Sequence, residues 1–143
     1  MLEPGEVRKR LRQTIETAKR EAATRRAALG DVQKAYDAFL EDHAVPVLRQ
    51  VASALKAEGH VFQVLTPAGT VRLVSDRDQD DFLEIVLDVS ERTPVVLGRV
   101  SYARGSRLHT AEGPIRENAR PSDLNDEDVL NWVLRVVLPF VER

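Results

Sequence analysis

Apolar residues recur every three or four positions from Val7 to beyond residue 40. This spacing is the period of an amphipathic helix, and between Ile15 and His43 the alternation of three and four forms a heptad repeat. The repeat is weak in its first half and becomes strongly apolar from Leu29 onward. Its stripe consists of Ile15, Ala18, Ala22, Arg25, Leu29, Val32, Tyr36, Phe39 and His43. The pattern therefore predicts a long N-terminal helix with one apolar stripe.

Two positions in this helix favour an interruption. Gly30 is a residue type that often ends helices, and the following Asp31 is a type that often begins them. Pro46 has a ring that clashes with the preceding helical turn. Beyond Pro46 an apolar face continues until Gly59, which is a good stop signal. We therefore expect a helix that either is continuous or breaks near Gly30 or Pro46.

The length of this helix has a consequence for the assembly. A continuous helix from residue 6 to residue 58 would be roughly 80 Å long. The rest of the chain would form a globule only about 25–35 Å across. The stripe then cannot be buried entirely against its own domain, so the helix either folds back or contacts another chain. We expect a homodimer whose interface is anchored by Leu29, Val32, Tyr36 and Phe39.

The middle of the chain changes to the alternating pattern of half-buried β-strands. Pro67 and Gly69 predict the turn of a first hairpin, and Gly105 with Ser106 predicts the turn of a second. Alternation in residues 81–90, broken only by Val86, predicts a strand with Glu84 and Asp88 on its solvated face. The expected strands lie within residues 60–66, 70–76, 81–90, 95–104 and 107–113.

The pattern in the last part of the chain predicts a final helix. Asn125 is a good N-cap, and the acidic residues 126–128 follow it where the helix dipole favours negative charge. Residues 129–138 are apolar over much of the helical circumference, which suggests burial on two sides. Helices at both ends of a group of strands predict an α+β fold with a four- to five-stranded antiparallel sheet, on which the C-terminal helix packs. We expect residues 1–30 to form a basic helical arm or coiled-coil extension, and residues 31–143 to form one α+β domain.

The second hairpin gathers several side chains that resemble a binding site. A two-residue turn at Gly105 and Ser106 pairs Arg99 with Glu112, Ser101 with Thr110, Val100 with Ala111 and Tyr102 with His109. Cross-strand pairing therefore accounts for most of the polar residues in this stretch. The remaining candidates for binding an anion or an acidic partner are Tyr102, Arg104, Arg107 and His109.

Composition and charge modify this picture. Hydrophobic residues make up 43% of the 143 residues, charged residues make up 31%, and cysteine is absent. No apolar run approaches the roughly 18 residues that a membrane span needs, so we expect a cytoplasmic protein without membrane contact. Residues 1–30 contain eight Lys and Arg but only four Asp and Glu, whereas the remainder contains thirteen and nineteen. This basic arm offers phosphate-contacting candidates in Arg8, Lys9, Arg12, Arg20, Arg25 and Arg26.

Motifs that would carry chemistry are absent from the sequence. Asp76, Asp78 and Asp80 alternate as in a calcium loop, but Asp81 and Leu87 stand where that loop needs glycine and glutamate. The three histidines fall in different predicted elements, and no phosphate loop or nucleophile elbow occurs. We therefore expect no enzymatic activity, no metal and no cofactor.

The sequence favours a non-enzymatic interaction or scaffold module that self-associates through its N-terminal helix. One alternative is an accessory protein that binds nucleic acid through the basic helix. A second alternative is a carrier of a small ligand, with a pocket between the sheet and the helices.

Overall fold

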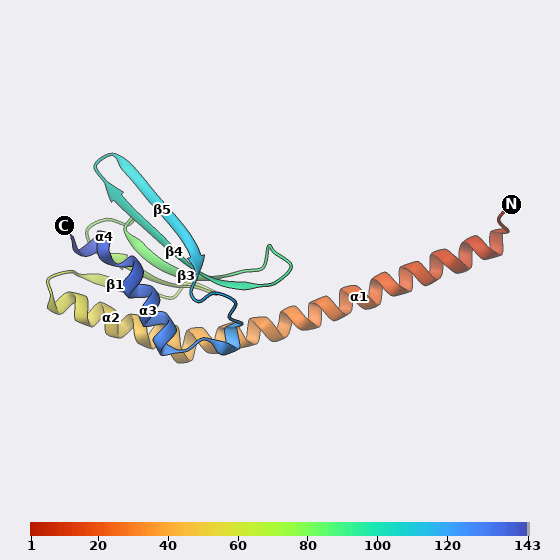
Figure 1. Ribbon diagram of the computed structural model, residues 1–143, viewed down its shortest axis with the longest axis horizontal. Coiled ribbons are helices and arrows are strands. Elements are labelled where there is room, and N and C mark those ends of the chain that lie inside the picture. The colour runs from red at the N-terminus through yellow and green to blue at the C-terminus, as the bar shows by residue number, and fades with distance from the viewer. Residues whose placement is uncertain (143) are drawn as a thin grey trace. The chain divides into compact units, whose positions relative to one another are not determined.

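The structure is a computed structural model that describes residues 1–142. Contacts within the chain divide it into two compact units, residues 1–34 and the part that begins at Ala35. The fold is α+β: a long N-terminal helical run precedes a five-stranded antiparallel sheet, and a further helix follows it (Figure 1). The fold class predicted from the sequence is therefore confirmed.

The first unit contains most of α1, which spans Pro4–Phe39. No residue between positions 4 and 34 is buried, and the helix passes through Gly30 without an end. Its backbone hydrogen bonds are made within the helix, and alanine and arginine, both strong helix formers, are frequent here. Although α1 has 36 residues, neither it nor any other described helix is both long enough and apolar enough to cross a membrane.

A π-helical turn, η1 (Leu40–Ala44), joins α1 to α2 (Val45–Ala57). Pro46 has no N–H to donate, and its ring clashes with the carbonyl group four residues earlier in a regular α-helix. Pro46 follows directly after a π-turn, in which the N–H of Val45 donates to the carbonyl of Leu40 and not to that of Glu41 as in an α-helix. The helical run thus continues to Ala57, and the expected break near Pro46 is a local change of helical period.

The sheet is a simple meander in which strands adjacent in sequence pair antiparallel. A left-handed Gly105, with a φ of 63°, turns the chain between the last two strands. Their register confirms the predicted pairs, including Tyr102 with His109 and Arg99 with Glu112. The five strands are β1 (Phe62–Leu65), β2 (Val71–Ser75), β3 (Phe82–Asp88), β4 (Val95–Arg104) and β5 (Arg107–Pro114).

One face of this sheet forms the core with α2 and α3 (Asp126–Val136), which lie along it in Figure 1. Trp132 of α3 packs directly on Gly98 of β4, where an added Cβ would come within 2.2 Å of the indole ring. Asn125 caps α3 as predicted, because its side chain accepts a hydrogen bond from the N–H of Asp128. The short helices η2 (Pro121–Asp123) and α4 (Leu138–Val141) flank α3. The largest fully buried apolar side chains are Tyr36, Phe39, Leu48, Leu73, Leu83, Ile85 and Ile115.

Candidate functional site

The helix of residues 4–34 presents apolar side chains to solvent. Val7, Leu11, Ile15 and Leu29 are between 41% and 57% exposed, and they fall on one side of the helix by its period. Ala18, Ala22 and Arg25 separate them into two patches along the stripe. We call Val7, Leu11 and Ile15 the N-terminal patch, and Leu29 with Val32 the C-terminal patch. Exposed apolar residues repeated on one helical face are typical of a helix that packs against a partner.

The four predicted anchor residues lie in two different environments. Leu29 is exposed and Val32 is half-buried, whereas Tyr36 and Phe39 are buried in the core of the second unit. The Tyr36 hydroxyl donates to the carbonyl oxygens of Gly69 at 2.8 Å and of Ile85 at 3.3 Å. Burial, with the nearby charges of Asp37 and Glu84, raises the pKa of Tyr36 above its usual value. Tyr36 and Phe39 are therefore core residues, and Leu29 and Val32 alone remain of the four as interface candidates.

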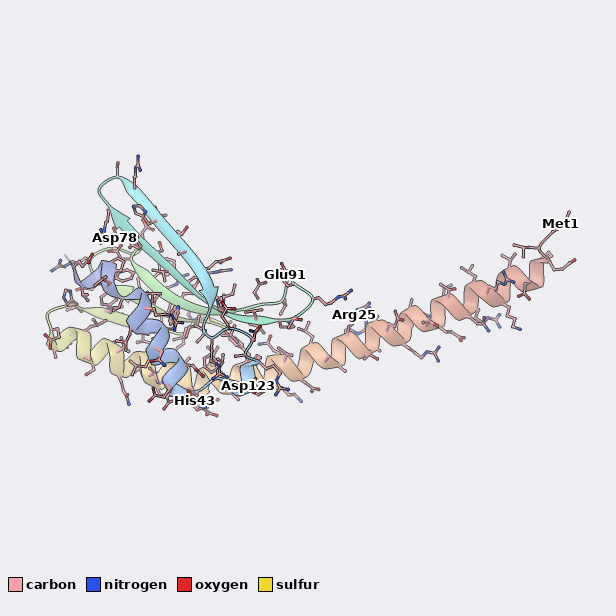
Figure 2. The ribbon with its side chains drawn as sticks, in the orientation of Figure 1. Met1, Arg25, His43, Asp78, Glu91 and Asp123 are labelled. Atoms are coloured by element: carbon pink, nitrogen blue, oxygen red, sulfur yellow. The ribbon has the colours of Figure 1, made fainter. Side chains whose placement is uncertain are left out.

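The predicted phosphate-contacting residues lie on the surface of α1. Arg8, Lys9, Arg12, Arg20, Arg25 and Arg26 are all exposed, and Figure 2 shows the side chain of Arg25 on the outside of the helix. Arg8, Arg12 and Arg26 flank one side of the apolar stripe, because successive residues are rotated by about 100°. One acidic side chain, Glu6, accepts a hydrogen bond from Arg10 at 3.0 Å. The arm thus combines exposed apolar patches with a basic flank.

A groove of about 280 Å³ lies between α2 and α3 in the second unit. Val47, Val51, Ala54 and Leu130 supply apolar surface, and the first turn of α3 supplies carboxylates. His43 Nδ1 lies 2.6 Å from Oδ1 of Asp126, one of the lining residues. Figure 2 shows His43 beside the start of α3. Sequence reasoning did not find this groove, because α2 and α3 come together only in the folded chain. Its lining residues are Val47, Gln50, Val51, Ala54, Asp126, Glu127 and Leu130.

The hairpin candidates are mostly engaged with neighbouring side chains. The rings of Tyr102 and His109 stack with centroids 5.0 Å apart, and Phe140 packs edge-on against Tyr102. Arg104 donates to Glu142 at 3.0 Å, and Arg107 lies exposed at the hairpin tip. The structure therefore brings three of the four residues together as a packed cluster joined to the C-terminal segment. An anion would have to compete with Glu142 for Arg104.

The sheet face away from the helices carries a row of alternating charges. Arg72, Glu84, Arg99 and Glu112 are neighbours across β2, β3, β4 and β5. Arg72 donates two hydrogen bonds to Glu84, at 2.6 and 2.9 Å, and Arg99 lies 3.7 Å away on the other side. Glu84 is only 6% exposed, so the expectation that it lies on a solvated face is wrong. The two arginine side chains cover it. Its burial could not be predicted from the local sequence, because these side chains come from two neighbouring strands.

The acidic stretch before β3 is a turn rather than a cation loop. The N–H of Asp80 donates to the Asp78 carboxylate, and the carboxylate of buried Asp81 accepts from the N–H of Ala103 at 2.8 Å. Within residues 1–142, no three His, Asp or Glu side chains are grouped so that they could hold a metal ion. A hollow beside His60 and Phe140 measures about 200 Å³, and both it and the groove of about 280 Å³ are smaller than the roughly 300–1,000 Å³ of most small-ligand sites. The surfaces of the arm and the groove are thus the stronger candidates for a functional role.

Comparison with known proteins leaves function to be argued from these surfaces. No protein-family model matches the sequence, no curated protein matches it, and no solved structure matches it.

Proposed function

We propose that this protein is a non-enzymatic interaction module that self-associates through its N-terminal helix. The observation that carries the proposal is the exposed apolar stripe of α1, in which no residue from 4 to 34 is buried. In a monomer these apolar side chains remain in water, so their alignment on one face of the helix contributes no stability. A second copy would cover them.

Burial of this stripe would contribute favourable free energy to association. Apolar surface contributes about 25 cal/mol per Å² when it leaves water, so fully burying a leucine or isoleucine side chain contributes roughly 1.5–3 kcal/mol. The exposed side chains of both patches together offer several such contributions in each copy. Association would also stabilise the helix itself, because isolated helices are marginal in water.

Light scattering of the full-length protein tests the proposal. We expect a dimer that weakens when Leu29 and Val32 are both replaced by serine, because these substitutions remove apolar surface from the stripe and neither residue belongs to the buried core. Ala27→Ser, on the opposite side of the same helix, is the matched control and should leave the mass unchanged. A monomer at every concentration of the unmodified protein contradicts self-association.

A second candidate function is nucleic-acid binding, which the exposed basic flank of α1 favours. It predicts binding of duplex DNA or RNA that weakens steeply with salt, because phosphate contacts release counterions. Replacing Arg8, Arg12 and Arg26 together by glutamine should weaken the mobility shift and its dependence on salt, whereas the serine substitutions at Leu29 and Val32 should not. Absence of any shift at low salt removes this candidate.

A further inference from the structure

An apolar surface begins in the groove between α2 and α3 and continues beyond it. Leu130 lies in the groove, Leu134 follows four residues later in α3, and Leu138 is the first residue of α4. These three leucines are 40%, 63% and 57% exposed, so the apolar row is largely uncovered in the single chain. A row of this kind on the outer side of a packed helix is a surface on which another helix can lie.

We propose that this groove receives the N-terminal patch of α1 from a second copy of the chain. This inference rests on the proposed self-association and assigns its contact surface. Two features of the second unit and of α1 support the assignment, namely the spacing of the apolar residues and the distribution of charge.

The apolar residues on the two surfaces have the same spacing. Val7, Leu11 and Ile15 lie four residues apart, and Leu130 and Leu134 of α3 have the same spacing. Rows at intervals of four form ridges on a helix, and interlocking two such ridges is the commonest mode of helix packing in globular proteins. The patch therefore has the geometry to pack into the groove and along α3.

The charges around the two surfaces are opposite. Residues 7–15 contain Arg8, Lys9, Arg10 and Arg12 and no acidic residue, whereas Asp126 and Glu127 lie at the groove. Parallel pairing of two copies of α1 would instead place these cations beside the same cations of the partner. Like charges disfavour that arrangement, and opposite charges favour the groove.

The proposed contact also accounts for a closed assembly. Each copy carries one N-terminal patch and one groove, so a two-fold arrangement satisfies both patches and both grooves in a dimer. The C-terminal patch, Leu29 and Val32, remains available for contact between the two helices within the same dimer.

The absence of cysteine from the sequence permits a direct test by disulfide trapping in the full chain. One copy carries Leu11→Cys, a second copy with an affinity tag carries Leu130→Cys, and the two are mixed and oxidised. Both positions are exposed, so neither substitution opens the core. We expect a mixed disulfide that forms severalfold more than with Gln13→Cys, an exposed control on the other side of α1.

Charge reversal provides the second measurement. Glu127→Lys in the copy with Leu130→Cys should reduce the mixed disulfide, and Arg8→Glu with Arg12→Glu in the other copy should restore it. If Leu11→Cys instead links mainly to Leu11→Cys of another copy, the helices pair with each other: self-association stands and the groove assignment is overturned. If the Leu11 and Gln13 variants link equally to Leu130→Cys, the groove assignment is overturned as well. A monomeric mass for the unmodified protein would overturn both proposals.

Discussion

The helical residues before and after Lys34 share one backbone conformation and have opposite environments. Residues 4–34 contain no buried side chain, whereas the next positions on the same stripe, Tyr36 and Phe39, are at most 2% exposed. The heptad pattern continues across this boundary without a change of period. Periodicity therefore predicts that a segment is helical and which side is apolar, but it does not predict what that side packs against.

The two parts of the helix differ in the residues that the rest of the fold places against them. Tyr36 donates its hydroxyl to backbone carbonyls of the β1–β2 turn and of β3, so its place is fixed by segments distant in the sequence. In residues 4–34 the stripe contains Ala18, Ala22 and Arg25, which offer little apolar surface. A stripe of this kind forms a helix readily but supplies little apolar surface for packing within the chain.

The largest expected effect comes from truncating one residue on each side of this boundary. Leu29 and Tyr36 occupy equivalent heptad positions one repeat apart. Tyr36→Ala should lower the free energy of unfolding by about 3–5 kcal/mol, the range for removing a large buried side chain. Leu29→Ala should change it by less than about 0.5 kcal/mol, as is usual for surface positions. Urea unfolding followed by fluorescence of Trp132, the single tryptophan, measures the second unit.

Both variants need the same protein concentration, because self-association would otherwise contribute to stability. Equal losses for the two substitutions would show that Leu29 is also part of a folded core. That result would contradict the division between the exposed helix and the buried one.

The sequence predicted local features well and long-range ones poorly. The two-residue turn fixes the register of its hairpin, so the pairing of Tyr102 with His109 followed from the turn predicted at Gly105 and Ser106. Asn125 as a helix cap and the α+β class also followed from local signals. The burial of Glu84 could not be predicted from local signals, because it depends on Arg72 and Arg99 in two other strands. The groove between α2 and α3 was missed for the same reason.

The next comparison replaces one glycine by alanine in each region. We expect the two substitutions to change stability in opposite directions, by less than Tyr36→Ala does. Gly98→Ala in β4 places a Cβ against the buried indole of Trp132, and such overpacking costs about 1–3 kcal/mol. Gly30→Ala in α1 meets no atom within 4 Å and should favour the helix by up to about 1 kcal/mol, the difference in helix propensity. Urea unfolding followed by circular dichroism measures the first, and amide hydrogen exchange around residue 30 measures the second.

Gly113→Ala is the matched control for the strand position. Gly113 is the cross-strand partner of Gly98, but an added Cβ there meets nothing within 4 Å. Its substitution should leave the unfolding midpoint almost unchanged. A loss as large as that of Gly98→Ala would mean that alanine is unfavourable in this sheet for a reason other than Trp132.

The smallest effects compare two ion pairs, one in each region. Glu84→Gln removes the charge from a buried acceptor of two arginine hydrogen bonds, and we expect a loss of about 1–2 kcal/mol because charge-assisted bonds are strong but both arginines are partly exposed. Glu6→Gln breaks an exposed pair with Arg10 one helical turn away, which is worth only about 0.2–0.5 kcal/mol.

The dependence on salt distinguishes the two ion pairs further, since added salt screens the exposed pair and leaves the covered one largely intact. Urea unfolding at low and high salt should therefore show a persistent loss for Glu84→Gln, and circular dichroism a small, salt-sensitive loss of helix for Glu6→Gln. If the effect of Glu84→Gln also disappeared in high salt, the carboxylate would be solvated, and the contrast between the two regions would not extend to their charges.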